Sequence, residues 1–248
     1  IIDTVMLFPG QGLRIPKKEK NDLEASTIIN FNHLPYLLVA GSASTAEREV
    51  FFLFPMNDLR KYETFPAHRF FQSLKDKGLN IINIEGVTTV GHTLVFANRA
   101  NIGNPHNHFI IVNENVIYEP ENNPSFIMQL DLEKSDTIMG VSGLAYIASK
   151  DLLLFTASVE LTENAIDDGT IGDSYLGYIK NFSSKMKGKN IKPDEVLNLS
   201  ALHPDFKGEK IESVCVESAA DKIILHLVAD NDDGTSTLFK LSLANPAQ

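Results

Sequence analysis

A four-residue signature that leads into an apolar strand recurs four times in this chain. The copies are Leu23-Glu24-Ala25-Ser26, Ile84-Glu85-Gly86-Val87, Val141-Ser142-Gly143-Leu144 and Ile211-Glu212-Ser213-Val214. Their second positions lie 61, 57 and 70 residues apart. A repeat of this length that is built of strands indicates a β-propeller, in which each unit forms one blade.

Period-two alternation and turn residues divide each unit into four antiparallel strands, the first of which is the inner strand that follows the signature. Outer strands are expected at Asn80–Asn83, Ile127–Leu132 and Val196–Leu199. The sequence therefore predicts an all-β, single-domain propeller over residues 1–248, with four blades, or five if another unit precedes Ile1. For the fourth unit, we expect Thr4–Phe8 to supply the outer strand and close the ring against Thr237–Leu243.

Two segments interrupt the repeat. Residues 66–77 have helical spacing at Phe70, Phe71 and Leu74, which predicts a short inserted helix that ends at Gly78. The polar segment Asn181–Pro193 is typical of a surface loop.

The amino-acid composition disfavours some classes of binding partner. The formal charge is −10 and the pI is near 5.1, which disfavours nucleic acid because phosphate binding requires the opposite sign. The apolar runs are too short to span a membrane. We expect a monomer. Cys215, the single cysteine, lies in an alternating apolar stretch and is expected to be a core residue. Since the chain begins at Ile1 rather than Met, we expect an upstream piece that was removed or is not included in this sequence, and we favour a periplasmic or extracellular location over the cytoplasm.

Antiparallel alternation places the signature glutamates on the same face as the loops between second and third strands. Those loops are rich in polar groups. The candidate ligand-binding residues are Arg48, Asn98, Arg99, Glu85, Glu160, Asp173 and Asp230. The candidate metal ligands are Glu24, Glu85, Glu212, Asp230 and Asp232.

Two interpretations of this acidic face remain open. Clustered carboxylates are the ligands that Ca²⁺ prefers, with Arg48 and Arg99 then available for an anionic group. Alternatively, the glutamates are architectural: they cap backbone N–H groups of a neighbouring blade and pair with Arg48 and Arg99. Other motifs carry less weight, because Ser142 occupies the glutamate position of the repeat, and His106 and His108 have no third ligand at a zinc spacing.

Several stretches, among them Ile84-Glu85-Gly86-Val87, Gly140–Tyr146, Asp167–Gly177 and Val228–Gly234, resemble a bacterial family of uncharacterised propeller proteins. More distantly, the blade start is similar to that of phytase-like esterase and SdiA-regulated propellers. Some members of those groups have acidic residues on the top face and bind calcium, so this resemblance implies that the same is possible here. The first resemblance implies a fold and no activity.

We expect a propeller that binds a small molecule, a glycan or a protein on the acidic face. The alternative is a calcium-dependent hydrolase of phosphoesters or other esters, in which a metal-bound water attacks the substrate.

Overall fold

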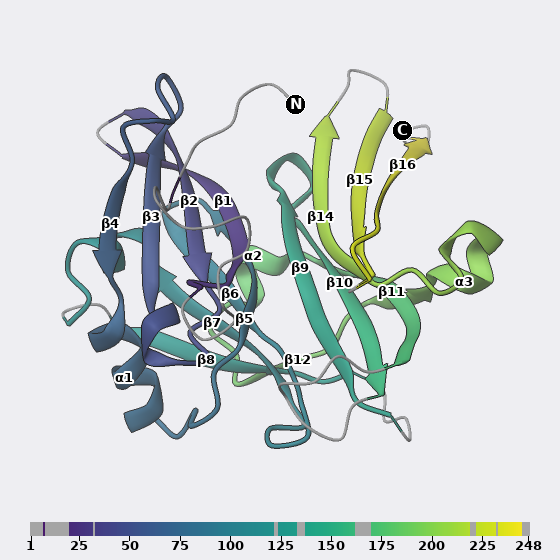
Figure 1. The fold of residues 1–248 in the computed structure, drawn as a ribbon, viewed down its shortest axis with the longest axis horizontal. Coiled ribbons are helices and arrows are strands. Elements are labelled where there is room, and N and C mark those ends of the chain that lie inside the picture. Colours follow the sequence, from purple (N-terminus) through teal and green to yellow (C-terminus); the bar gives the residue numbers. More distant parts are fainter. Residues whose placement is uncertain are drawn as a thin grey trace.

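The computed structural model describes residues 7, 20–31, 33–121, 124–132, 137–161, 170–218, 222–231 and 233–244. Four antiparallel sheets are arranged as the blades of a propeller (Figure 1). The predicted all-β propeller with four blades is thus confirmed.

Each blade begins with its inner strand. Blade 1 contains β1 (Leu23–Phe31), β2 (Leu34–Gly41), β3 (Val50–Pro55) and β4 (Glu63–Pro66), and blade 2 contains β5 (Ile84–Val90), β6 (Thr93–Asn98), β7 (Asn107–Asn113) and β8 (Ser125–Leu130). Blade 3 contains β9 (Met139–Ile147), β10 (Leu152–Leu161), β11 (Thr170–Lys180) and β13 (Glu195–Asn198), and the strands described for blade 4 are β14 (Ile211–Ser218), β15 (Lys222–Asp230) and β16 (Ser236–Ala244). The helices are α1 (His68–Asp76), α2 (Phe182–Lys185) and α3 (Leu199–Leu202), with single 3-10 turns at Ala46–Arg48, Glu114–Ile117, Ala148–Lys150 and Pro204–Phe206.

The core lies between successive blades. Phe51 of blade 1 stacks on Phe96 of blade 2 with ring centroids 5.8 Å apart, and Phe70 of α1 packs against both rings. Phe109 and Phe155 share the next cluster, between blades 2 and 3. Because blades 2 and 3 are covered on both faces, their strands read as nearly continuous apolar runs.

The inserted helix is confirmed as α1, with Phe70, Phe71 and Leu74 buried. Gly78 follows its last turn at φ +97°, a conformation that favours glycine. The expected outer strand at Asn80–Asn83 is wrong. Glu63–Pro66 precedes the helix and pairs with β3, and so occupies the outer edge of blade 1.

Two smaller expectations also fail. Residues 181–193 are more than a surface loop: Phe182 is fully buried, and β12 (Asn190–Ile191) adds to β8 as a parallel strand. Cys215 is exposed. Its neighbours Val214 and Val216 pack in the cluster between blades 3 and 4, so alternation turns Cys215 to the opposite face of β14.

The ring-closing strand proposed at Thr4–Phe8 lies outside the described residues, except for Leu7. The Leu7 carbonyl accepts a hydrogen bond from Tyr62 Oη at 3.1 Å, and Leu7 packs against the apolar cluster of Val50, Phe52 and Phe54 in blade 1. Pairing of this run with blade 4 stays a prediction.

Gly177 offers a test of how tightly blade 3 is packed. It lies opposite Phe155 in the β10–β11 pair, and a Cβ atom there would stand 2.1 Å from Phe155 Cζ. We expect Gly177→Ala to destabilise the fold by about 2 kcal/mol, because the fully buried ring has no room to move. Thermal unfolding should show a fall in Tm of roughly 4–8 °C.

The matched control combines Gly177→Ala with Phe155→Leu, which removes the obstructing ring. If the contact causes the loss, the double variant should be more stable than the sum of the two single losses implies. Simple additivity of the two losses would contradict this explanation.

Candidate functional site

The repeated signature is a β-bulge at the start of each inner strand. Leu23 pairs with Gly41 and Ala25 with Ala40, so Glu24 is an extra residue without a partner across the strand pair. The same irregularity leaves one unpaired residue in every other blade: Glu85, Ser142 and Glu212. A bulge redirects the side chain of the extra residue, and here it does so at the same place in all four blades.

Hydrogen bonds to the preceding blade fix the bulges of blades 2, 3 and 4. The N–H of Ile84 donates to the Ser42 carbonyl at 2.7 Å. The N–H of Val141 donates to Asn107 Oδ1 at 2.9 Å, and that of Ile211 to Ser174 Oγ at 3.0 Å. In these three blades, the residue before the bulge makes the link between blades that the architectural interpretation assigned to the glutamates.

Arg99 joins the bulges of different blades. It follows β6 of blade 2, and its Nη1 lies 4.0 Å from Glu85 Oε2 and 3.7 Å from Glu212 Oε2 of blade 4. Its Nη2 donates to Ser158 Oγ of blade 3 at 3.1 Å. The side chain of Arg99 is only 9% exposed, so the guanidinium is a largely buried charge shared by three blades.

Gly140 makes room for this arginine. A Cβ atom at Gly140 would stand 2.7 Å from Cγ and Nε of Arg99. Only glycine admits so close an approach between the start of β9 and the arginine side chain.

Lys210 is the second cation of the site. Its Nζ lies 3.4 Å from Glu212 Oε1, and its side chain is 12% exposed. Glu212 Oε1 is itself buried and makes no hydrogen bond within the described residues. The oxygen is thus held near a positive charge without a directed partner.

Glu24 stands beside a separate ion pair. Arg48 donates to Asp22 Oδ2 at 2.6 Å and to Ser44 Oγ at 2.8 Å, and Lys20 lies 2.5 Å from Asp22 Oδ1. Burial opposes ionisation of Asp22, but hydrogen bonds from Lys20 and Ser42 and the charges of Lys20 and Arg48 hold its pKa below the usual value. Asp22 is therefore ionised and repels Glu24.

All three glutamates have pKa values raised to about 7. Desolvation of the carboxyl group is the main cause for each, including Glu24, whose residue as a whole is exposed. For Glu24, repulsion by Asp22 and Glu212 adds to the increase, and the charge of Lys20 opposes it. For Glu85 and Glu212, the charge of Arg99 opposes the increase, while Glu24 repels Glu85 and Glu85 repels Glu212. These mutual effects show that the three carboxyl groups of blades 1, 2 and 4 form one electrostatic unit, which we call the axial glutamate site.

Ser142 takes the place of the fourth glutamate. It is buried, and its Oγ lies 2.6 Å from the Ile211 carbonyl oxygen and 3.1 Å from Thr156 Oγ1. The serine therefore links blades 3 and 4 and adds no charge to the site.

The other predicted residues lie in different surroundings. Asn98 is fully buried and accepts a hydrogen bond from the Asn83 N–H at 2.7 Å, which makes it part of the blade 2 scaffold. Asp173 is exposed and accepts from Asn198 Nδ2 at 2.9 Å. Asp230 is exposed, and its N–H donates to the Lys210 carbonyl. The Glu160 side chain and Asp232 lie outside the described part of the chain.

Sequence reasoning missed Asp22, Asn83, Gly140 and Lys210, although each lies two residues before a bulge residue. This position was a usable signal. Asn83 donates to Glu85 Oε1 at 2.6 Å, and the others place a carboxylate, an arginine and an ammonium group at the site.

Within the described ranges, no group of three His, Cys, Asp or Glu side chains has an arrangement able to hold a metal ion. None of the described helices is long and apolar enough to cross a membrane.

A family model extends over almost all of this architecture: the family of unknown function DUF6929 matches residues 1–243. The chain belongs to this family. A search of curated proteins found no match. The DUF6929 match agrees with the propeller fold and carries no activity, so function has to be argued from the axial glutamate site.

Glu24→Gln tests the charge repulsion in this DUF6929 member. A carboxyl group whose pKa is raised from 4.5 to about 7 is more easily protonated in the folded state, so stability falls as pH rises through that window. We expect the variant to match the parent near pH 4.5 and to be more stable at pH 8. Because Glu24 is exposed, solvent screens part of the effect, and we expect a gain below about 1 kcal/mol.

Urea unfolding at both pH values measures this difference. Glu63→Gln, at an exposed position of β4, is the control and should change stability equally little at either pH. A Glu24→Gln effect that does not depend on pH would refute the electrostatic explanation.

Arg99→Met should have the opposite effect. Without the guanidinium, ionised Glu85 and Glu212 lose their main opposing charge, and we expect a loss on the order of 3 kcal/mol at pH 8. The loss should be smaller at pH 5, where both carboxyl groups are protonated in the folded state. Arg60→Met, whose side chain is 77% exposed in the parent, should stay within about 0.5 kcal/mol of the parent. Equal losses for Arg99→Met at the two pH values would mean that packing, rather than charge, explains the effect.

Proposed function

We propose that the protein is a binding propeller and that the axial glutamate site takes the positively charged group of a small organic molecule. The observation that carries the proposal is that Glu24, Glu85 and Glu212 converge from three blades around Arg99 and Lys210, where burial raises their pKa values to about 7. Arg99 and Lys210 lie beside Glu85 and Glu212, whereas the repulsion of Glu24 by Asp22 and Glu212 outweighs its attraction to Lys20. A ligand with one positive charge would favour the ionised form of Glu24.

Access and hydrogen-bonding capacity support the same proposal. Glu24 is an exposed residue, so the site reaches the protein surface in blade 1. Its carboxylate, once ionised, is a hydrogen-bond acceptor that an N–H donor can approach from there. A protonated amine supplies both the charge and the donors.

The calcium-dependent hydrolase is the weaker alternative. Calcium needs about six to eight oxygen ligands, whereas Arg99 and Lys210 already lie beside two of the three glutamates. No arrangement of a nucleophile and a base in the described residues favours hydrolysis over binding. The calcium hypothesis is kept as one arm of the test.

The test is calorimetric titration at pH 7 with spermidine, choline, arginine amide and calcium chloride, each in two buffers with different ionisation enthalpies. We expect at least one organic cation to bind with release of roughly one proton, because a cation favours the ionised carboxylates. Affinity should rise between pH 6 and pH 8 and should fall at least tenfold in Glu24→Gln combined with Glu85→Gln. Glu63→Gln is the matched control and should bind as the parent does.

Each outcome discriminates between ligand classes. Calcium binding without organic-cation binding would replace the proposed ligand with a metal ion. Saturable binding of an organic cation without proton release would place the binding at another surface and contradict the proposal. If none of the four probes binds at millimolar concentration, the proposal is wrong and the glutamates are architectural.

A further inference from the structure

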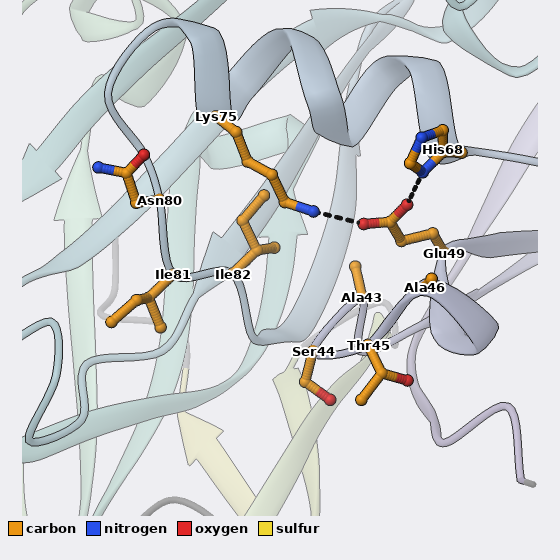
Figure 2. Close-up of a pocket in the computed structure, with 10 residues that line it drawn as sticks. All are labelled: Ala43, Ser44, Thr45, Ala46, Glu49, His68, Lys75, Asn80, Ile81 and Ile82. Carbon is orange, nitrogen blue, oxygen red and sulfur yellow. Dashed lines mark hydrogen bonds and ion pairs between the residues drawn. The ribbon is translucent and has the colours of Figure 1, made fainter. Parts of the chain in front are cut away.

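A pocket beside α1 contains none of the three glutamates of the axial glutamate site. Its cavity of about 260 Å³ is bounded by the loop that joins β2 to β3, by α1, and by the segment that leads from α1 to β5 (Figure 2). The lining residues are Ala43, Ser44, Thr45, Ala46, Glu49, His68, Lys75, Asn80, Ile81 and Ile82. Sequence reasoning assigned no role to this pocket.

Glu49 organises one wall. Its side chain is 1% exposed, and both carboxylate oxygens are occupied: Lys75 Nζ lies 2.7 Å from Oε1, and His68 Nδ1 lies 2.5 Å from Oε2. A buried carboxylate requires such partners, since an unpaired buried charge is strongly unfavourable. Glu49 therefore holds His68 and Lys75 at fixed positions beside the cavity, although the two residues are about two turns apart on α1.

The groups left for a ligand are mainly donors. An ammonium group has three N–H donors and no acceptor, and only one of those of Lys75 is directed at Glu49, while its side chain remains 32% exposed. Figure 2 shows Lys75 extending from α1 toward Glu49, with Ser44 and Thr45 on the opposite side. The exposed Asn80 amide adds two donors, and the His68 side chain is 64% exposed.

The remaining wall is apolar. Ala43 and Ile82 are buried with exposed fractions of 3% and 4%, and Ile81 is partly exposed beside them. The pocket thus combines a donor-rich side with an apolar side. This is the combination expected of a site that holds a polar head group and a short hydrocarbon body.

We propose that this pocket binds the oxyanion group of a small organic acid, a carboxylate or a phosphate, with Lys75 as the charged donor. Lys75 contacts the oxyanion, the Asn80 amide contributes a hydrogen bond, and Ala43, Ile81 and Ile82 contact the carbon atoms. A cation is disfavoured because the one carboxylate of the pocket is already shared by a lysine and a histidine. The inference does not depend on the axial site, which has the opposite charge preference and shares no residue with the pocket.

The test is a titration of the isotope-labelled protein with inorganic phosphate and, separately, with propionate, followed by amide chemical shifts at constant ionic strength. We expect saturable shifts in the millimolar range at Thr45, Ala46 and Lys75 for at least one probe. Binding of phosphate alone would identify a phosphate ester as the ligand class, and binding of propionate alone a carboxylic acid. Absence of saturable shifts with both probes would overturn the proposal.

Variants distinguish the pocket from general attraction of anions. Lys75→Met should weaken binding at least tenfold, whereas Lys77→Met, just beyond the end of the same helix and hydrogen-bonded to Ser125, should bind as the parent does. Since Lys75→Met leaves Glu49 with fewer partners, the double variant Glu49→Gln with Lys75→Met removes both charges and should keep the fold. Parent-like binding by a folded form of either Lys75 variant would also overturn the proposal.

Discussion

The β-bulge at the start of every inner strand is the constraint on which the site depends. In a regular strand, the residue at this position would lie on one blade face, within the packing between blades. The extra residue breaks that alternation, while in blades 2, 3 and 4 the residue before it is hydrogen-bonded to the preceding blade. Three bulges therefore bring Glu24, Glu85 and Glu212 into one electrostatic unit, although each belongs to a different sheet.

Arg99 determines how far this arrangement can be stabilised. It lies near Glu85 and Glu212 and is hydrogen-bonded to Ser158, so a single guanidinium serves blades 2, 3 and 4. On the blade 1 side, Lys20 attracts Glu24, but Lys20 and Arg48 are both paired with Asp22, which repels Glu24. The blade 1 side of the site consequently has the least compensated carboxyl group. That uneven balance is what distinguishes a site able to accept a cation from a closed network of ion pairs.

The repeat made most of the fold predictable from the sequence, whereas several features that depart from the repeat were missed. The signatures and the runs of second strands identified all four blades, and the spacing of Phe70, Phe71 and Leu74 identified the inserted helix. The outer strand of blade 1 was expected at Asn80–Asn83, before the next signature, whereas pairing of Glu63–Pro66 with β3 depends on contacts that local pattern does not encode. At the site, the glutamates and Arg99 were visible in the sequence, but their shared pKa and the role of Gly140 depend on distances between blades. The cluster of Glu49, His68 and Lys75 was not predicted. Glu49 lies just before β3, and His68 and Lys75 lie near the two ends of α1, so none of the three belongs to the repeated signature.

The short strand β12 has a consequence for how the molecule meets other chains. Residues that leave blade 3 cross to blade 2 and pair with β8, so Gln129 and Asp131 donate their N–H groups to Lys189 and Ile191 rather than presenting them at an open sheet edge. Unpaired edges are templates for strand addition by a second molecule. Blade 2 is therefore protected from edge-to-edge association by its neighbour. The same short crossing also means that blade 3 cannot detach from the ring without exposing the edge of blade 2.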